Sequence, residues 1–432
     1  MLTPKPTTGD SSWFTTARFG MFIHWGLYAL PARHEWVKSR EEITDEQYQP
    51  YFDHFNPTLY DPAEWARAAW EAGMRYVVLT SKHHEGFCLW DSQFTDYKAT
   101  NTPYGKDLLT PFVEAFRAQG FRIGFYYSLL DWHHPDFPID IHHPLRNRED
   151  TAELNAERDM RKYAEYMRNQ VRELLTNFGQ IDVLWFDFSY PGQEYKGLPG
   201  KGRDDWESEK LLALARELQP QVLLDNRLDL PEAADIYTPE QIQPIEWVRV
   251  DGEPVVWEAC QTFSGSWGYH RDEESWKSAG QLIRMLINTV ACGGNLLMNV
   301  GPTSRGALDY RAVNALSEYG DWMKLHSESI YGCTQSQFEA PPDCRLTQKG
   351  ATVYVHIFAW PFKHLHLKGL GDNVSYAQLL HDGSEVGMND MPEWQKANMT
   401  GDDSILVLTL PVKQPNVVVP VIELTLKTVT VA

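Results

Sequence analysis

The architecture is indicated most clearly by residues 61–80, which read DPAEWARAAWEAGMRYVVLT. Asp61 followed by Pro62 is typical of a helix start, because an aspartate side chain caps the first turn and proline fits the first helical position. Gly73 is a typical helix end. The run after it, Tyr76-Val77-Val78-Leu79-Thr80, is apolar without alternation. Such a run predicts a strand covered on both faces, as in a parallel sheet.

Similar pairs of helix and strand occur along the first three quarters of the chain. Further helices are predicted over residues 110–120, 151–178, 205–218 and 275–291. Further strands are predicted over residues 22–24, 121–127, 183–186, 222–224, 236–237, 255–257 and 296–300. This number of βα units favours a distorted (β/α)8 TIM-like barrel. A doubly wound sheet is the alternative, although the glycine-rich phosphate loop that such a sheet often has is missing from the sequence.

The pattern changes near Cys333. Residues 351–356, 404–410 and 417–426 alternate or are β-branched, and turns rich in Gly, Asp, Asn and Pro separate them. We therefore predict two domains, a catalytic (β/α)8-like barrel at residues 1–335 and a C-terminal antiparallel β-sandwich at residues 336–432.

Composition excludes several classes of partner. Asp and Glu total 59 against 39 for Lys and Arg, a formal net charge of −20, which argues against nucleic-acid and membrane-surface partners. The first ten residues lack the apolar core of a signal peptide, so we expect a cytoplasmic protein. A secreted protein whose signal has been trimmed is the alternative. The five cysteines form no CxxC pair and are expected to be buried free thiols.

Polar side chains follow nearly every predicted strand. They are His24, His83 and His84, Tyr126 and Tyr127, Asp187, Arg227 and Glu240. Catalytic groups of a βα barrel lie at the carboxyl ends of its strands, so these side chains are candidates for one site.

Three chemistries fit such a set to different degrees. A metal-dependent hydrolase could use His24, His83, His84 and Asp187, but adjacent histidines on an extended strand point in opposite directions. A serine or cysteine nucleophile lacks a GxSxG elbow. Glycoside hydrolysis by two carboxylates fits best, because the chain also supplies hydrogen-bonding groups and aromatic walls: 13% of its residues are Phe, Trp or Tyr. A non-catalytic sugar-binding protein is a further alternative.

Five ordered segments make this reading more specific: RFGMFIHWG at 18–26, SKHHEGF at 81–87, VLWFD at 183–187, SWGY at 266–269 and GGNLLMNVGP at 293–302. Together they resemble the signature segments of the family-29 glycoside hydrolases, the α-L-fucosidases. The resemblance implies an exo-acting retaining enzyme that uses no metal or other cofactor. It also implies a distorted barrel followed by a β-sandwich, and a fucosylated oligosaccharide or glycoconjugate as substrate. The oligomeric state is left open, and a homo-oligomer is one of the options.

The resemblance also implies roles for single residues. Asp187 occupies the position of the nucleophile, which forms a fucosyl-enzyme. The segment Tyr237-Thr238-Pro239-Glu240 resembles the one that contains the general acid/base in bacterial members, so Glu240 is expected to have that role. Glu258 is the alternative acid/base. The positions that match sugar-binding residues are His24, Glu35, Trp36, His83, His84, Tyr127, Trp185, Arg227 and Trp267.

Some of these expectations are more detailed. Tyr127 is expected to donate to the nucleophile, Arg227 to hold a ring or nucleophile oxygen, and Trp267 to pack against the methyl group of fucose. Phe188 differs from the family, in which glycine often follows the nucleophile. Trp394, in the polar residues 389–404, is expected to pack on the sandwich, or to line a partner surface or the side where the sugar leaves.

Overall fold

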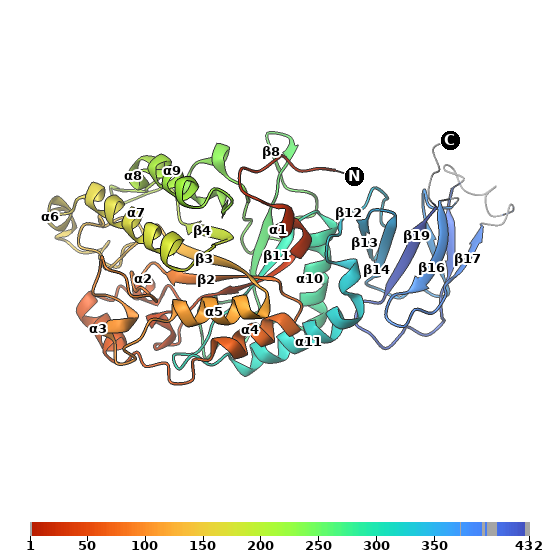
Figure 1. Ribbon diagram of the computed structural model, residues 1–432, viewed down its shortest axis with the longest axis horizontal. Coiled ribbons are helices and arrows are strands. Elements are labelled where there is room, and N and C mark those ends of the chain that lie inside the picture. The colour runs from red at the N-terminus through yellow and green to blue at the C-terminus, as the bar shows by residue number, and fades with distance from the viewer. Residues whose placement is uncertain (1, 372, 391–393, 395–403, 428–432) are drawn as a thin grey trace.

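The computed structural model describes residues 2–371, 373–390, 394 and 404–427. Within these residues, seven parallel strands form one curled sheet in the order β10-β11-β1-β2-β3-β4-β7. The strands are β1 (Phe19–Ile23), β2 (Tyr76–Lys82), β3 (Arg122–Ser128), β4 (Val183–Asp187), β7 (Leu223–Leu224), β10 (Glu258–Thr262) and β11 (Asn295–Val300). The predicted barrel-like parallel sheet is therefore confirmed, and antiparallel sheets lie beside it in the C-terminal region (Figure 1).

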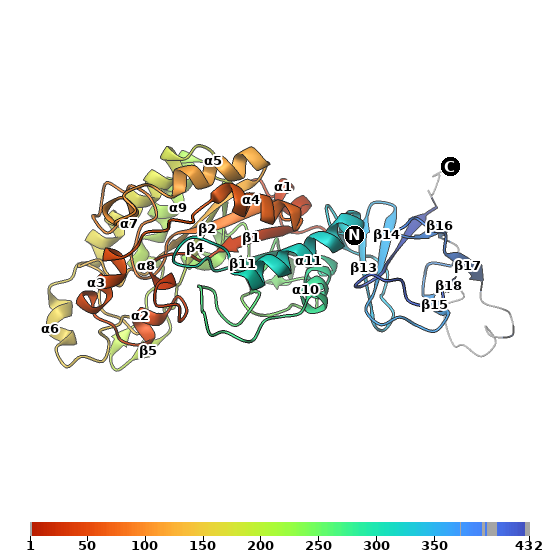
Figure 2. The same ribbon diagram turned by 90° about the horizontal axis from the view of Figure 1, so that it is seen from below.

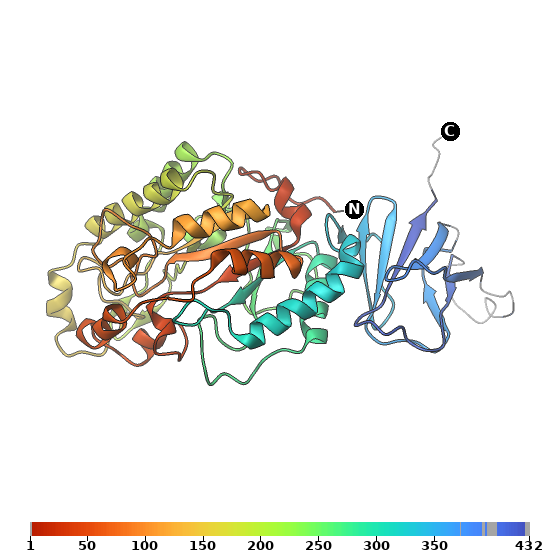
Figure 3. The same cartoon turned by 60° about the horizontal axis from the view of Figure 1, so that its bottom comes forward.

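Helices cover the outer side of the curled sheet (Figures 1 and 3). The long ones are α4 (Pro62–Glu71), α5 (Leu109–Gln119), α7 (Met160–Asn177), α9 (Ser208–Leu218), α10 (Ala279–Ala291) and α11 (Tyr310–His326). Shorter helices lie ahead of β1, as α1 (Ser12–Ala17), or in the segments that follow the strands, as α2 (Val37–Arg40), α3 (Asp45–Asp53), α6 (Thr151–Ala156) and α8 (Arg203–Trp206). In the described part of the chain, no helix is long and apolar enough to span a bilayer.

Local signals explain where these helices begin and end. Asp61 caps α4 by accepting hydrogen bonds from the backbone N–H groups of Ala63 and Glu64. Two predicted helices are each split in two. The helix predicted over 151–178 is interrupted before Met160, because Asp159 caps α7 through the N–H of Arg161. The helix predicted over 205–218 is interrupted at Glu207, whose φ of 49° is left-handed.

Alternate residues of each strand face the interior of the curled sheet. On β4, Val183 and Trp185 belong to the interior apolar cluster, whereas Leu184 and Phe186 belong to the cluster on the other side. Asp187 is the next interior position after Trp185, because side chains alternate along a strand. The same alternation applies to the other parallel strands, so every second side chain of each strand faces the interior.

The eighth strand of the predicted barrel is only partly formed. Residues 236–240 make three isolated parallel bridges: Ile236 to Asp225, Tyr237 to Trp257, and Glu240 to Cys260. The strand predicted over 255–257 begins three residues later, as β10. The irregular segment 236–240 thus lies between the two edge strands β7 and β10, and it contains Glu240.

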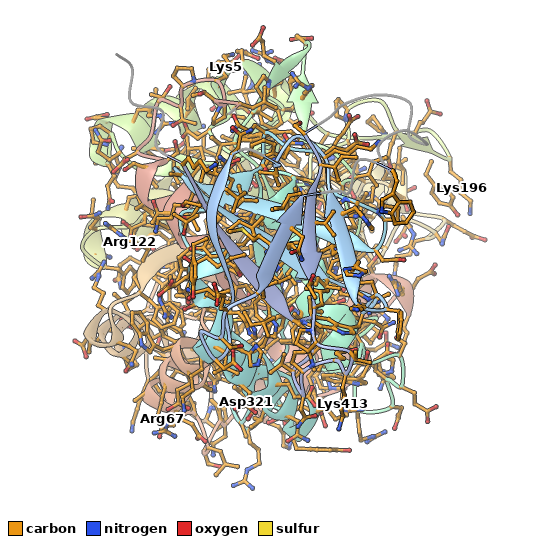
Figure 4. The ribbon with its side chains drawn as sticks, turned by 90° about the vertical axis from the view of Figure 1, so that its right-hand side faces the viewer. Lys5, Arg67, Arg122, Lys196, Asp321 and Lys413 are labelled. Atoms are coloured by element: carbon orange, nitrogen blue, oxygen red, sulfur yellow. The ribbon has the colours of Figure 1, made fainter. Side chains whose placement is uncertain are left out.

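The C-terminal region consists of two antiparallel sheets in the described residues, ordered β12-β13-β14-β19-β16 and β15-β18-β17. Their strands are β12 (Thr334–Gln335), β13 (Cys344–Lys349), β14 (Thr352–Ile357), β15 (His364–Leu367), β16 (Val374–Leu379), β17 (Gly387–Asp390), β18 (Leu406–Thr409) and β19 (Val421–Leu426). A separate apolar cluster lies within this region. Figure 2 shows the C-terminal sheets at one end of the elongated molecule, and Figure 4 shows them from that end.

The exact division between the two domains stays a prediction, although β12 already pairs with β13. Two short hairpins, β5 (Glu194–Tyr195) with β6 (Leu198–Pro199) and β8 (Arg249–Val250) with β9 (Glu253–Pro254), extend from the barrel loops. The five cysteines are buried and form no disulfide, as predicted. Most of residues 389–404 lies outside the described residues, so the expectation for the loop around the exposed Trp394 stays a prediction.

Candidate active site

A cavity lies at the carboxyl ends of the parallel strands. The loops that follow these strands, with α2, α3 and α6, occupy the end of the molecule away from the C-terminal sheets (Figure 1). The cavity is lined by buried aromatic and sulfur-containing side chains (Phe22, Tyr126, Trp185, Cys260), buried polar ones (His24, Glu35, His83, His84, Asp187) and more exposed ones (Trp36, Phe188, Glu240, Trp267). We call the last group the rim.

Asp187 is held by hydrogen bonds from two neighbouring side chains. The hydroxyl of Tyr126 donates to its Oδ2 over 2.7 Å, and Nη1 of Arg227 donates to its Oδ1 over 2.9 Å. Nε2 of His84 lies 3.8 Å from Oδ2. Burial raises the pKa of Asp187 to about 6; the Arg227 charge opposes this rise, and the charge of Glu240 adds to it. The Asp187 carboxyl is therefore ionised above about pH 6.

Arg227 joins two carboxylates of different exposure. Its Nη2 donates to Oε2 of Glu240 over 2.8 Å, while Nη1 is bonded to Asp187. Its Nε donates to the hydroxyl of Thr238 over 3.0 Å, and the guanidinium lies over the ring of Trp185. The side chain of Glu240 is 42% exposed and that of Asp187 only 12%. One guanidinium thus keeps a buried and a rim carboxylate close to each other.

The hydrogen bonds of His24 assign its tautomer. Its Nδ1 lies 2.7 Å from Oδ1 of Asn299, and the amide nitrogen of Asn299 donates to the carbonyl of Trp267. The oxygen of Asn299 therefore faces His24, so Nδ1 of His24 has the proton and Nε2 is an acceptor. Burial lowers the pKa of His24 to about 3, which keeps the ring neutral.

The same reasoning applies to His84. Its Nδ1 lies 2.7 Å from the hydroxyl oxygen of Ser128, and that hydroxyl donates to the carbonyl of Leu130. Nδ1 of His84 is therefore the donor, and its Nε2 is an acceptor on the side of Asp187. Burial holds the pKa of both His83 and His84 well below the usual value.

Both adjacent histidines line the cavity, contrary to the expectation that they point in opposite directions. The reason is local: β2 ends at Lys82, after a register shift between Thr80 and Lys82, and His83 and His84 lie in the turn beyond it. Their ring centroids are 4.0 Å apart.

Glu35 and the two neighbouring tryptophans also reach the cavity. The N–H of Gly268 donates to Oε2 of Glu35 over 2.8 Å, which ties the loop of Trp267 to that of Glu35. Burial raises the pKa of Glu35. Trp36 contacts the ring of His84 edge to face, with centroids 4.9 Å apart.

Two predicted site residues lie elsewhere. The hydroxyl of Tyr127 donates to Gln170 of α7, because Tyr127 is an outward-facing position of β3; Tyr126, the inward-facing one, bonds to Asp187 instead. Glu258 lies behind the cavity wall, fully buried, and accepts hydrogen bonds from Tyr76 and Trp185.

Burial raises the pKa of Glu258 to about 7. Its carboxyl accepts a hydrogen bond from the indole of Trp185 and does not line the cavity. This position is unsuited to proton transfer to a bound substrate.

Three cavity residues were absent from the candidates named from the sequence: Phe22, Phe188 and Cys260. A fourth, Tyr126, was a strand-end candidate without an assigned role. The period of two along the strands is the signal for three of them, because Phe22, Tyr126 and Cys260 share the interior cluster with Trp185. Phe188 follows the last residue of β4, where no such period applies.

Two loops contain adjacent histidines, at residues 131–134 and 140–143, and both form turns. Oδ1 of Asp131 accepts from the N–H groups of His133 and His134, and Oδ1 of Asp140 accepts from those of His142 and His143. Among the residues that the structure describes, no three or more His, Cys, Asp and Glu side chains are arranged to hold a metal ion.

The known proteins to which this chain is similar are α-L-fucosidases. The model of the α-L-fucosidase family matches residues 5–328. The solved structure of α-L-fucosidase isoenzyme 1 from Paenibacillus thiaminolyticus is 45% identical with a TM-score of 0.90, and the match covers 97% of this chain and 99% of that one.

Two more distant relatives agree. A trapped covalent intermediate of a Bacteroides thetaiotaomicron α-L-fucosidase with 2-fluoro-fucosyl fluoride is 28% identical with a TM-score of 0.82, covering 99% of this chain and 98% of that one. Human plasma α-L-fucosidase is 29% identical over 81% of this chain and 76% of its own length.

Proposed function

Because this chain belongs to the α-L-fucosidase family of glycoside hydrolases, we propose that its cavity removes terminal α-linked fucose by double displacement, with Asp187 as nucleophile and Glu240 as general acid/base. A retaining reaction is supported by the related fucosidase whose covalent intermediate has been trapped. The observation on which the assignment rests is the single guanidinium of Arg227, which bonds to both carboxylates.

In the first step, a carboxylate oxygen of Asp187 attacks the anomeric carbon and the glycosidic C–O bond breaks. Glu240 gives its proton to the departing oxygen. In the second step, Glu240 takes a proton from water, the water oxygen attacks the anomeric carbon, and the bond to Asp187 breaks. The fucose leaves with the configuration of the substrate, and both carboxyl groups return to their starting states.

The environment of Asp187 suits the nucleophile. Tyr126 and Arg227 each donate to one of its oxygens, so the carboxylate is fixed in orientation and its charge is balanced. When one oxygen forms the covalent bond, the hydrogen bond to the other oxygen stays available to hold the ester in place.

The position of Glu240 suits the acid/base. It is at the rim, where a leaving group and water arrive, and Arg227 places it beside the nucleophile. In retaining enzymes the two carboxyl groups lie about 5–5.5 Å apart. Two carboxylates bonded to different nitrogens of one guanidinium are necessarily near neighbours. Glu258 lacks both access and this partner.

The remaining cavity residues fit a terminal fucose. The unprotonated Nε2 atoms of His24 and His84 can accept hydrogen bonds from two sugar hydroxyls. Trp267 and Phe22 supply an apolar surface for the methyl group. The buried rings of Phe22, Tyr126 and Trp185 form the floor of the cavity, which fits a site for one terminal sugar.

Nucleophile replacement tests the assignment of Asp187. Asp187→Ala should abolish turnover of an aryl α-L-fucoside, and azide should restore part of the rate and give β-fucosyl azide, because azide attacks from the vacated side. Full activity of this variant without azide would contradict the assignment.

A leaving-group series tests the assignment of Glu240. Glu240→Ala should lose little rate on substrates whose leaving group departs without protonation, and much more on natural glycosides. Glu258→Gln is the matched control: it should show no such difference between substrates. If the leaving-group dependence appears in the Glu258 variant and not in the Glu240 variant, the acid/base role belongs to Glu258.

A further inference from the structure

Phe188, the residue directly after Asp187, has an unusual backbone. Its φ is 86°, in the left-handed region that side chains with a β-carbon rarely adopt. Glycine adopts this conformation without strain. A bulky side chain persists there only where the surrounding structure holds it.

Four aromatic rings hold the ring of Phe188. The centroid of its ring lies 5.2 Å from Trp36, 5.3 Å from His84, 5.0 Å from His142 and 5.4 Å from Tyr190. All four contacts are tilted or edge to face, the arrangements that aromatic pairs prefer. The ring is thus fixed in direction although the backbone is strained.

The ring of Phe188 belongs to the rim of the cavity. It lines the cavity together with Trp36, and both are only partly buried, unlike the floor residues Phe22 and Trp185. Glu240 is on the same rim and has to reach the oxygen between fucose and its leaving group. A leaving group that departs past Glu240 therefore extends along the rim, where Phe188 and Trp36 offer flat apolar surfaces.

We propose that Phe188 is a specificity-determining residue that forms, with Trp36, an apolar wall for the first sugar of the leaving group. The ligand it fits is a pyranose ring that turns its C–H face to the aromatic surface. This inference rests on the proposed function, because it takes Asp187 and Glu240 as the reacting carboxyl groups. The strain at Phe188 is then the cost of placing a ring beside the nucleophile.

Two substrates with different leaving groups test the proposal. In a fucosyl disaccharide the leaving group is a pyranose, whereas in α-L-fucosyl fluoride it is one atom that cannot reach the wall. Phe188→Gly keeps a residue suited to a φ of 86° and removes only the ring. We expect kcat/KM on the disaccharide to fall about 3- to 10-fold, mainly through KM, since an aromatic contact contributes about 0.5–1.5 kcal/mol.

The same variant should lose less kcat/KM on α-L-fucosyl fluoride than on the disaccharide, because fluoride makes no contact with the wall. Asp251→Gly is the matched control, because Asp251 also has a positive φ (50°) but is in the exposed β8–β9 turn. It should leave the ratio between the substrates unchanged. If Phe188→Gly does not fold, Phe188→Asn, which tolerates the left-handed region, replaces it.

An unchanged ratio between the two substrates overturns the proposal. A larger loss on α-L-fucosyl fluoride than on the disaccharide also overturns it, because Phe188 would then act on the fucose itself. In each of these cases hydrolysis of α-L-fucosyl fluoride by the wild-type enzyme keeps the proposed function intact. A wild-type enzyme without that activity would instead contradict the proposed function.

Discussion

Replacing Arg227 should move the pH dependence of catalysis in a direction that the structure determines. The nucleophile has to be ionised, and burial raises the pKa of Asp187 to about 6. We therefore expect kcat/KM to fall on the acid side with an apparent pKa near that value. The charge of Arg227 lowers the pKa of Asp187, so its removal in Arg227→Met raises it further and moves the acid limb to higher pH.

The size of this shift follows from the Arg227–Asp187 hydrogen bond of 2.9 Å between largely buried side chains. A hydrogen bond to a charged group contributes about 1.5–3 kcal/mol, and about 1.4 kcal/mol corresponds to one pKa unit, so we expect a shift of about 1–2 units. The assay is the pH profile of kcat/KM with an activated aryl α-L-fucoside, whose leaving group needs no protonation.

Thr238→Val is the matched control for this experiment. Arg227 also donates to the Thr238 hydroxyl. Replacing Arg227 therefore loosens the segment that contains Glu240, in addition to removing the charge beside Asp187. Thr238→Val removes that anchor and keeps the Arg227 charge on Asp187, and its acid limb should stay at the wild-type pH. The reasoning is refuted if Arg227→Met lowers the rate but leaves the acid limb of the kcat/KM profile at the wild-type pH. The acid limb would then not reflect the ionisation of Asp187.

Tyr126→Phe should lower kcat/KM about 10- to 100-fold, because it removes the hydrogen bond to charged Asp187. Tyr127→Phe should keep full activity. Its free energy of unfolding, measured by denaturant titration, should fall by only about 1 kcal/mol. Equal activity loss in both variants would contradict the strand register. Glu258→Leu should slow all substrates alike, because it frees the indole of Trp185; a loss limited to poor leaving groups would contradict this positioning role. EDTA should leave hydrolysis of an aryl α-L-fucoside unchanged, and inhibition reversed by added metal would favour the metal-dependent alternative.

The alternation of helices and strands could be predicted from the sequence because the parallel strands are continuous apolar runs. Residues 76–80 and 183–186 are both in the sheet, since each run is covered on both faces. The interruption before Met160 could not be predicted in the same way. Asp159 is acceptable within a charged helix and also as a cap, and only the folded chain decides between these roles.

The site was predicted where polar residues end buried strands, as with His24 and Asp187. The choice between Tyr126 and Tyr127 was wrong, because both residues follow the same apolar run and only the register of the strand decides which one faces inward. The contacts of Arg227 with Asp187 and Glu240 depend on the irregular segment 236–240, which has no periodic pattern to read.

The central claim is that Asp187 forms the covalent bond to fucose, and trapping the intermediate tests it most directly. The wild-type enzyme is incubated with 2-fluoro-fucosyl fluoride, digested, and its peptides are sequenced by mass spectrometry. We predict one added 2-fluorofucosyl group on the peptide that contains Asp187, in step with the loss of activity. A label on Glu240, on Glu258 or on another residue, with Asp187 unmodified, would contradict the account.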